Sequence, residues 1–251
     1  MIDWKKHFDR IWCISYTGFP ERRAGAEREL KRVGILDSGI FGWQRTVPTI
    51  FNDILFDVTK NRNVNDCKTK GCMSCLFGHY ACMKASLGLG GRRVLILEDD
   101  VRFRKDIEEV GHSLDRLPSD SDIVLFDWFA RFYPNDRKNV SELERMKADS
   151  VNEVYSRYDH LWGADCYMLS ARAMEDIVRQ IECKLYPIDH YTSYLSDCHG
   201  LNRYFCIDQI AVQADTERSN NSDIYGPNVE AVAYGLAGVD LSRFNLENPQ
   251  K

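Results

Sequence analysis

Three consecutive carboxylates, Glu98, Asp99 and Asp100, directly follow the apolar run 94–97. Like charges this close repel one another, and burying them at the end of a strand is costly unless a cation or water compensates them. Carboxylate oxygens suit a hard divalent ion such as Mn²⁺ or Mg²⁺, which can also bind the phosphates of a nucleotide. The triplet therefore predicts a metal and nucleotide site, and the alternative is a solvated acidic turn.

A second group of reactive residues precedes the triplet and consists of Cys72, Cys75, His79 and Cys82, with Cys67 before them. These residue types suit zinc. On a helix, however, four such side chains lie along one face over about 15 Å, whereas tetrahedral ligands must converge on one ion. One ion could take only neighbours such as Cys75 and His79. We therefore expect a stripe that packs against the core, and a zinc-dependent interaction module is the alternative.

The elements that position these residues alternate between strands and helices. Strands are expected at 10–16, 40–47, 94–97, 122–127 and 166–169, and helices at 21–33, 72–89, 105–117 and 171–181. Pro20 suits a first helical turn and Ser170 an N-cap. The predicted fold class is α/β with a mostly parallel central sheet, in which ligands bind beyond the carboxyl ends of the strands. Residues 133–157 are expected to form a loop or short helix over the site.

Length and charge limit the class of protein. The 251 residues predict one domain over 1–225 and an irregular tail over 226–251. A net charge of -5 without a long Lys/Arg run argues against nucleic-acid binding. No stretch is apolar enough to span a membrane, and the N-terminus lacks the apolar core of a signal peptide. We expect the cysteines to be free thiols and the protein to be cytoplasmic. Peripheral association with a membrane is compatible with this expectation.

Several landmarks occur in a familiar order. Cys75 and His79, followed by the acidic triplet, match a pattern of Gly-Cys-x-x-Ser-His, a helix and an apolar strand that ends in Glu-Asp-Asp. Further matches are Gly163 to Ala173, Pro187-Ile-Asp189 and Ser222-Asp-Ile224. In these landmarks the chain resembles glycosyltransferase family 25, which includes bacterial lipooligosaccharide galactosyltransferases and the collagen galactosyltransferases.

The resemblance implies a GT-A type fold and an inverting, metal-dependent transfer. The donor would be a UDP-sugar, with UDP-galactose as the leading choice, and the cofactor Mn²⁺, with Mg²⁺ as its substitute. The acceptor would be a hydroxyl group on a glycan, a lipid-linked sugar or a protein. The resemblance also implies a role in lipopolysaccharide biosynthesis. This chain has Ser15-Tyr16-Thr17 where the family has Asn-Leu-Asp. This departure affects the preference for the nucleotide and sugar of the donor more than any other property.

Each site residue then has an expected role. Asp100, helped by Asp99, would hold the metal, and Glu98 would orient the ribose or a metal-bound water. For the base that activates the acceptor, Asp189 is the first choice because it matches the Pro-x-Asp motif, and Asp127 is the second. Asp189 could instead cap a helix. The residues expected to bind the donor are Tyr16, Thr17, Arg22, Arg23, His79, Glu98, Asp99 and Asp223.

Two of these assignments have structural alternatives, and so does the function as a whole. Arg22 and Arg23 suit phosphate oxygens, but they could also form an exposed helix start. An α/β domain with carboxylates at its strand ends also suits a nucleotidyltransferase or a metal-dependent phosphohydrolase, because fold does not fix function.

Overall fold

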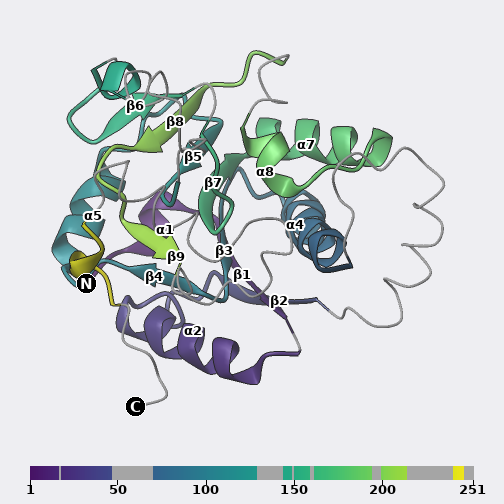
Figure 1. The fold of residues 1–251 in the computed structure, drawn as a ribbon, viewed down its shortest axis with the longest axis horizontal. Coiled ribbons are helices and arrows are strands. Elements are labelled where there is room, and N and C mark those ends of the chain that lie inside the picture. The colour runs from purple at the N-terminus through teal and green to yellow at the C-terminus, as the bar shows by residue number, and fades with distance from the viewer. Residues whose placement is uncertain are drawn as a thin grey trace, which may run out of the picture.

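A seven-stranded sheet forms the centre of the protein, in the order β2-β1-β3-β7-β5-β8-β6 (Figure 1). The structure is a computed structural model that describes residues 1–16, 18–46, 70–128, 144–148, 150–158, 161–193, 199–213 and 240–245. The strands of this sheet are β1 (Arg10–Tyr16), β2 (Phe41–Thr46), β3 (Arg93–Glu98), β5 (Ile123–Leu125), β6 (Tyr155–Arg157), β7 (Cys166–Ser170) and β8 (Arg203–Cys206).

Most strands of the sheet run in one direction. β1 pairs in parallel with both β2 and β3, and β5 pairs in parallel with β8. β7 lies between β3 and β5 and is antiparallel to both, so these two neighbours share a direction. At the edge, β6 is antiparallel to β8. The predicted α/β class with a mostly parallel central sheet is confirmed, and the sequence did not reveal that β7 runs the other way.

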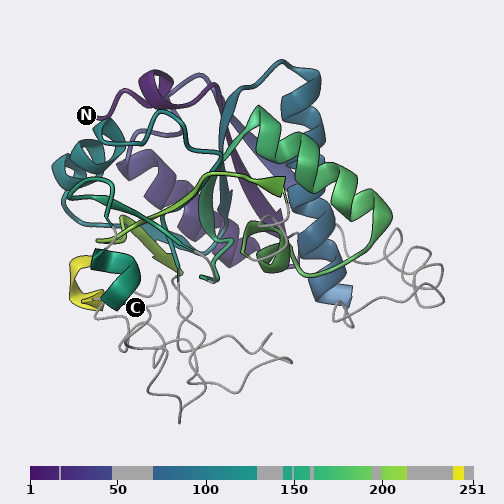
Figure 2. The same ribbon diagram turned by 90° about the horizontal axis from the view of Figure 1, so that it is seen from above.

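Helices cover both faces of the sheet (Figure 2). α4 and α7 lie on one face, and α1, α2 and α5 lie on the other. The helices are α1 (Trp4–His7), α2 (Pro20–Arg32), α4 (Lys70–Gly88), α5 (Ile107–Asp115), α7 (Ala171–Cys183) and α8 (Ile188–Thr192). No helix in the described part of the chain has both the length and the apolar character needed to cross a membrane.

The central strand β3 shows why both faces are covered. Val94 and Ile96 pack into the core beneath α4 and α7, whereas Leu95 and Leu97 pack into the core on the side of α1, α2 and α5. Successive side chains of a strand point to opposite faces, so a continuous apolar run supplies both cores. All four side chains are at most 1% exposed. The polar residues that follow this run therefore lie at the edge of a fully buried strand.

Local sequence signals set several helix boundaries where they were expected. Pro20 stands in the first turn of α2, where its missing N–H costs no hydrogen bond. The Ser170 hydroxyl accepts a hydrogen bond from the Ala173 backbone N–H and caps α7. Asp106 caps α5 in the same way by accepting from the backbone N–H groups of Glu108 and Glu109. Ser170 is also the last residue of β7, so its cap fixes where this strand ends and α7 begins.

Two segments differ from expectation. Residues 144–148 are helical, but 155–157 form the edge strand β6 rather than a loop or helix, because Tyr155 and its neighbours pair with β8. Directly after the acidic triplet, β4 (Val101–Phe103) pairs with β9 (Ala211–Gln213) in a separate antiparallel ribbon. Short strands of three residues carry little periodicity, and only their partners define them.

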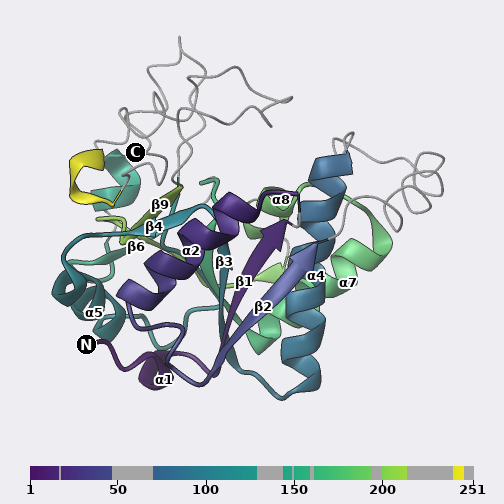
Figure 3. The same ribbon diagram turned by 90° about the horizontal axis from the view of Figure 1, so that it is seen from below.

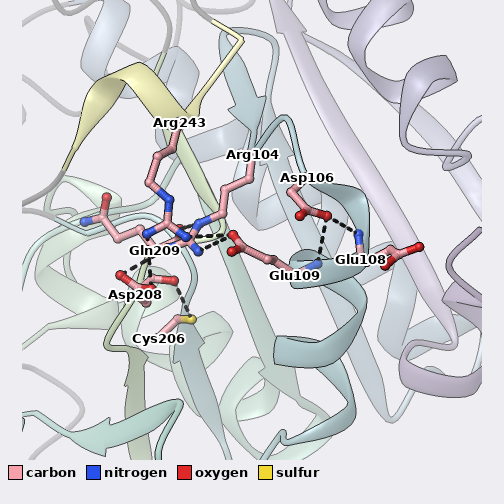
Figure 4. A network of polar contacts seen from close by, with 8 residues as sticks. All are labelled: Arg104, Asp106, Glu108, Glu109, Cys206, Asp208, Gln209 and Arg243. Carbon is pink, nitrogen blue, oxygen red and sulfur yellow. Dashed lines mark hydrogen bonds and ion pairs between the residues drawn. The ribbon is translucent and has the colours of Figure 1, made fainter.

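A network of arginines and carboxylates holds β9 and the segment 240–245 against α5 (Figure 4). Arg104 contacts Glu109 over 2.9 Å and Asp208 over 3.2 Å, and Arg243 contacts the same two carboxylates over 2.7 and 3.3 Å. Arg104 also donates to the backbone oxygen of Gln209. Because this network anchors the turn that enters β9, it helps to position Gln213, which reaches the acidic triplet.

Candidate functional site

The acidic triplet lies where β3 ends, and one arginine bridges two of its members. The Arg22 Nη2 atom is 2.7 Å from Asp99 Oδ1 and 2.7 Å from Asp100 Oδ2. Arg22 comes from the first turn of α2, which directly follows β1, the neighbour of β3. Asp99 also accepts a hydrogen bond from the backbone N–H of Tyr16, at the end of β1, over 3.1 Å. Two adjacent strand ends thus supply the carboxylates and their counter-charge.

Asp100 is a buried carboxylate, and one of its two oxygen atoms can accept a further ligand. Its Oδ2 atom accepts from the Gln213 side chain over 3.0 Å and contacts Arg22. Its Oδ1 atom is buried and has no hydrogen-bond partner among the residues that the structure describes. Burial raises the pKa of Asp100, although the nearby Arg22 charge partly offsets this. A buried oxygen of this kind is costly unless something else, such as a cation, binds it.

Glu98 faces a different set of partners. Its Oε1 atom lies 3.1 Å from His79 Nε2 and 3.4 Å from the Cys75 Sγ atom. Burial tends to raise the pKa of Glu98, but the hydrogen bond and charge of His79, the charge of Arg22 and the hydrogen bond of Cys75 together lower it below its usual value. On the other side of its ring, His79 Nδ1 lies 2.7 Å from the Tyr167 hydroxyl. Glu98 is therefore connected through α4 to β7.

Asp165 is a member of the site that sequence reasoning missed. Oxygen atoms of Glu98, Asp100 and Asp165 all lie within 4.8 Å of one another. Burial raises the pKa of Asp165 well above its usual range, and the negative charges of Glu98, Asp127, Asp100 and Asp189 raise it further. Asp165 immediately precedes the apolar run of β7, which could have marked it as a strand-end carboxylate. Its place at this edge depends on the reversed direction of β7.

Both residues expected to act as a base lie within electrostatic reach of this cluster. Asp127 follows β5 by two residues and is fully buried at 0% exposure. Asp189 is half-buried in the first turn of α8, where Pro187 holds the N-cap position, so Asp189 does not cap this helix. α8 contacts α4 and lies toward the end of the sheet to which the arrow of β1 points (Figure 3). Of the two carboxylates, only Asp189 has a partly exposed side chain that a second substrate could approach.

The remaining expected residues lie elsewhere or outside the described residues. Arg23 points away from the triplet, because its guanidinium stacks over the Trp43 ring at 4.1 Å and bonds to Glu27 over 3.1 Å. Arg22 and Arg23 are adjacent on a helix, so their side chains diverge by about 100°. Thr17 and Asp223 lie outside the residues that the structure describes.

The cysteine stripe on α4 packs as expected. Cys82 is fully buried in the core, and Cys72 and Cys75 are partly buried against it. All three are free thiols, whereas Cys67 lies outside the described residues. The row does not converge on one ion, but Cys75, His79 and Glu98 offer three ligand atoms that lie within 4.8 Å of one another.

The arrangement suits a hard cation beside a cationic side chain. Glu98, Asp100 and Asp165 supply only oxygen ligands, which Mn²⁺ and Mg²⁺ prefer. Arg22 adds a guanidinium, which matches phosphate oxygens in shape and charge. Burial and, after it, the repulsion of neighbouring carboxylates raise the pKa of Asp165, and a cation would neutralise that repulsion. The fit is therefore to a divalent ion and a phosphorylated ligand at the same strand ends.

Comparison with known proteins points to one family. A family model described as "Glycosyltransferase family 25 (LPS biosynthesis protein)" matches residues 10–192. The human protein "Inactive glycosyltransferase 25 family member 3" is 24% identical over 206 residues, which cover 78% of this chain and 33% of that protein. The mouse protein "Procollagen galactosyltransferase 2" is 26% identical over 137 residues, which cover 54% of this chain and 21% of that protein. The chain spans about a third or less of the length of these curated relatives.

Solved structures of similar shape include a glycosyltransferase involved in the glycosylation of the major capsid of PBCV-1. It aligns with a TM-score of 0.44 and 10% identity, and the alignment covers 92% of this chain and 100% of that one.

Proposed function

The chain belongs to glycosyltransferase family 25, and from this premise we propose that it transfers a hexose from a UDP-sugar to a hydroxyl acceptor. Galactose is the leading choice of hexose. The reaction depends on a divalent metal and inverts the configuration at the anomeric carbon. The acceptor is a glycan, a lipid-linked sugar or a protein side chain. The mouse relative is named a procollagen galactosyltransferase, which supports galactose as the first donor to test.

One observation carries this proposal: buried carboxylates from different elements converge at the edge where β1 and β3 end. Glu98 is the last residue of β3, Asp100 follows that strand by two residues, and Asp165 precedes β7. The Oδ1 atom of Asp100 is buried and has no hydrogen-bond partner among the described residues. A cluster that served only the fold would lower the stability of the protein, because burial and neighbouring negative charges raise the pKa values of Asp99, Asp100 and Asp165. A ligand that binds the cluster explains why it is there.

Mn²⁺ is the proposed ion, and Asp100, Asp165 and Glu98 are the residues that would hold it, with Asp99 in support. When bound, such an ion supplies a Lewis acid that stabilises negative charge on the leaving diphosphate. Arg22 contributes a second positive group for the same phosphates. Asp99 in turn holds Arg22 in place and accepts from Tyr16 N–H.

Asp189 is the proposed base for the acceptor hydroxyl. An inverting transfer needs a group that takes the proton while the hydroxyl attacks the sugar, and a positioned carboxylate does this. Asp189 is half-buried on α8, and it is near enough to the acidic cluster for its charge to raise the pKa of Asp165. The 0% exposure of Asp127 makes it the less accessible of the two carboxylates.

The experiment that tests the function is a thermal-shift panel of nucleotide sugars with and without Mn²⁺. A ligand that binds only the folded state raises the midpoint of unfolding, so a UDP-sugar that shifts it only with Mn²⁺ identifies the donor. Asp100→Asn should remove this dependence and leave the ligand-free midpoint unchanged or higher. If no nucleotide sugar shifts the wild-type protein under either condition, the proposal is wrong.

A catalytically silent donor-binding domain is the second candidate, because the 24% identical human relative is named inactive. The two candidates agree on the thermal shift and differ in turnover. Release of free UDP from UDP-galactose with Mn²⁺ favours the transferase. Release of pyrophosphate from a nucleotide substrate would point to nucleotidyl transfer instead.

A further inference from the structure

We propose that Cys75, His79 and Glu98 form a second cation site, which takes Zn²⁺ or another borderline-soft divalent ion. Cys75 and His79 are four residues apart on α4, so both side chains lie on the helix face that meets Glu98 at the end of β3. The Glu98 Oε1 atom lies 3.4 Å from the Cys75 sulfur and 3.1 Å from His79 Nε2. All three ligand atoms lie within 4.8 Å of one another.

Tyr167 gives this group the supporting contact that zinc-binding histidines normally have. Metal-binding histidines usually donate their other ring N–H to an oxygen, which fixes the tautomer and the ring orientation. The Tyr167 hydroxyl lies 2.7 Å from His79 Nδ1, and both residues are fully buried at 0% exposure. With the proton on Nδ1 donated to Tyr167, the lone pair of Nε2 faces Glu98 and Cys75.

The ligand types select the ion. A thiolate, an imidazole and a carboxylate suit zinc, which takes S, N and O ligands, whereas Mn²⁺ prefers oxygen alone. Three protein ligands leave one position for water or another group. Burial, with the Glu98 charge, raises the pKa of the Cys75 thiol well above its usual value, so ion binding must release the thiol proton to solvent.

The proposed zinc site and the oxygen cluster share one ligand, Glu98. Glu98 belongs to both groups of three, while Asp100 and Asp165 belong only to the oxygen cluster. Where the proposed transferase function holds, zinc at Cys75 would therefore compete for Glu98 and inhibit transfer. The zinc site itself does not depend on that function.

Co²⁺ titration of the purified protein tests the site, because a cobalt–thiolate bond gives a near-ultraviolet charge-transfer band. We expect one equivalent of Co²⁺ to produce the band, and one equivalent of Zn²⁺ to remove it. Cys75→Ser should abolish it. Cys72→Ser is the matched control, since Cys72 lies one turn away on the same helix, is partly buried, and is outside the group. It should keep the band.

Two further measurements keep the proposal testable if a variant folds poorly. Tyr167→Phe should weaken Co²⁺ binding by about 10- to 100-fold, the usual effect of losing the partner of a ligating histidine. X-ray absorption of the zinc-loaded wild type should show one sulfur among its ligands. Asp100→Asn should keep the band even if it abolishes transfer, which separates failure of this site from failure of the proposed function.

Three outcomes would overturn the proposal. They are the absence of a thiolate band in the folded wild type, the survival of the band in Cys75→Ser, and an absorption spectrum with two or more sulfur ligands. In the first case the three residues form a hydrogen-bonded packing cluster, and in the others the ion is held by different cysteines.

Discussion

The backbone oxygen of Asp165 accepts a hydrogen bond from the backbone N–H of Glu98 over 2.9 Å. This bond joins the start of β7 to the end of β3, which run in opposite directions. A carboxylate that precedes one strand is therefore placed beside a carboxylate that ends the other. Without the reversal, Asp165 would lie at the far edge of the sheet.

Asp165→Asn should stabilise the metal-free protein and impair metal binding. Burial and, after it, the neighbouring carboxylates raise the pKa of Asp165, so this group opposes folding at neutral pH, where the unfolded chain holds it ionised. Urea unfolding at pH 7 in the presence of a chelator measures the gain. Asp115→Asn is the control, because Asp115 is half exposed beside Lys6 and should not stabilise the protein. A loss of stability in Asp165→Asn would contradict the electrostatic account.

Asp99 should make the free energy of unfolding depend on pH, and the direction of its pKa shift sets the sign of this dependence. Burial, which outweighs the ion pair with Arg22, raises its pKa from 3.8 to about 6. Between these values the folded state keeps a proton that the unfolded state releases, so the free energy of unfolding falls as pH rises from about 4 to about 6, by about 3 kcal/mol for this group. Subtracting the profile of metal-free Asp99→Asn from that of the wild type should reveal this fall. Parallel profiles would show that Asp99 titrates normally.

Arg22→Gln should change the affinity for the metal and the affinity for the donor in opposite directions. The guanidinium contacts Asp99 and Asp100, so it competes with a cation for the same carboxylates, yet it suits the diphosphate of a donor. Calorimetry should show tighter Mn²⁺ binding without nucleotide and weaker UDP binding with Mn²⁺. The neighbouring Arg23→Gln serves as control, because Arg23 stacks on Trp43 and should change neither affinity. Equal effects of the two variants would refute the assignment.

Asp189→Asn should lower turnover by about 10²- to 10⁴-fold, the usual contribution of a general base, while UDP-sugar affinity stays within about twofold. Steady-state transfer and donor titration separate the two quantities. Asp127→Asn is the comparison, since Asp127 is fully buried and should act mainly through stability. If Asp189→Asn weakens the donor alone while Asp127→Asn depresses turnover, their roles are reversed.

Gly163→Ala should destabilise the fold by about 2 kcal/mol or more. A Cβ atom at Gly163 would lie 2.3 Å from the backbone oxygen of Asp127, and the φ of +144° is one that other residues rarely adopt. Gly88→Ala is the matched control: nothing lies within 4 Å of its Cβ position at the end of α4, so stability should stay equal or rise by up to about 1 kcal/mol. Thermal unfolding of both variants compares them, and equal midpoints would contradict this account.

The sequence alone determined the strands at 10–16 and 94–97, the helices α2, α4 and α7, and the place of the acidic triplet at the end of a strand. These features depend on local signals: apolar runs, Pro20, and the Ser170 cap act over a few residues. The ordered landmarks also identified the family, which the match over residues 10–192 confirms.

Only the tertiary structure decided which carboxylates join the triplet. Asp165 belongs to the site because β7 runs antiparallel to β3, and strand direction is set by chain connections that leave no local mark. Arg22 turns toward Asp99 while Arg23 turns toward Trp43, which depends on how α2 is rotated against the sheet. The pairing of Cys75 and His79 with Glu98 likewise needs α4 packed against the end of β3. Contacts between distant segments, and not the local spacing of residues, assemble this site.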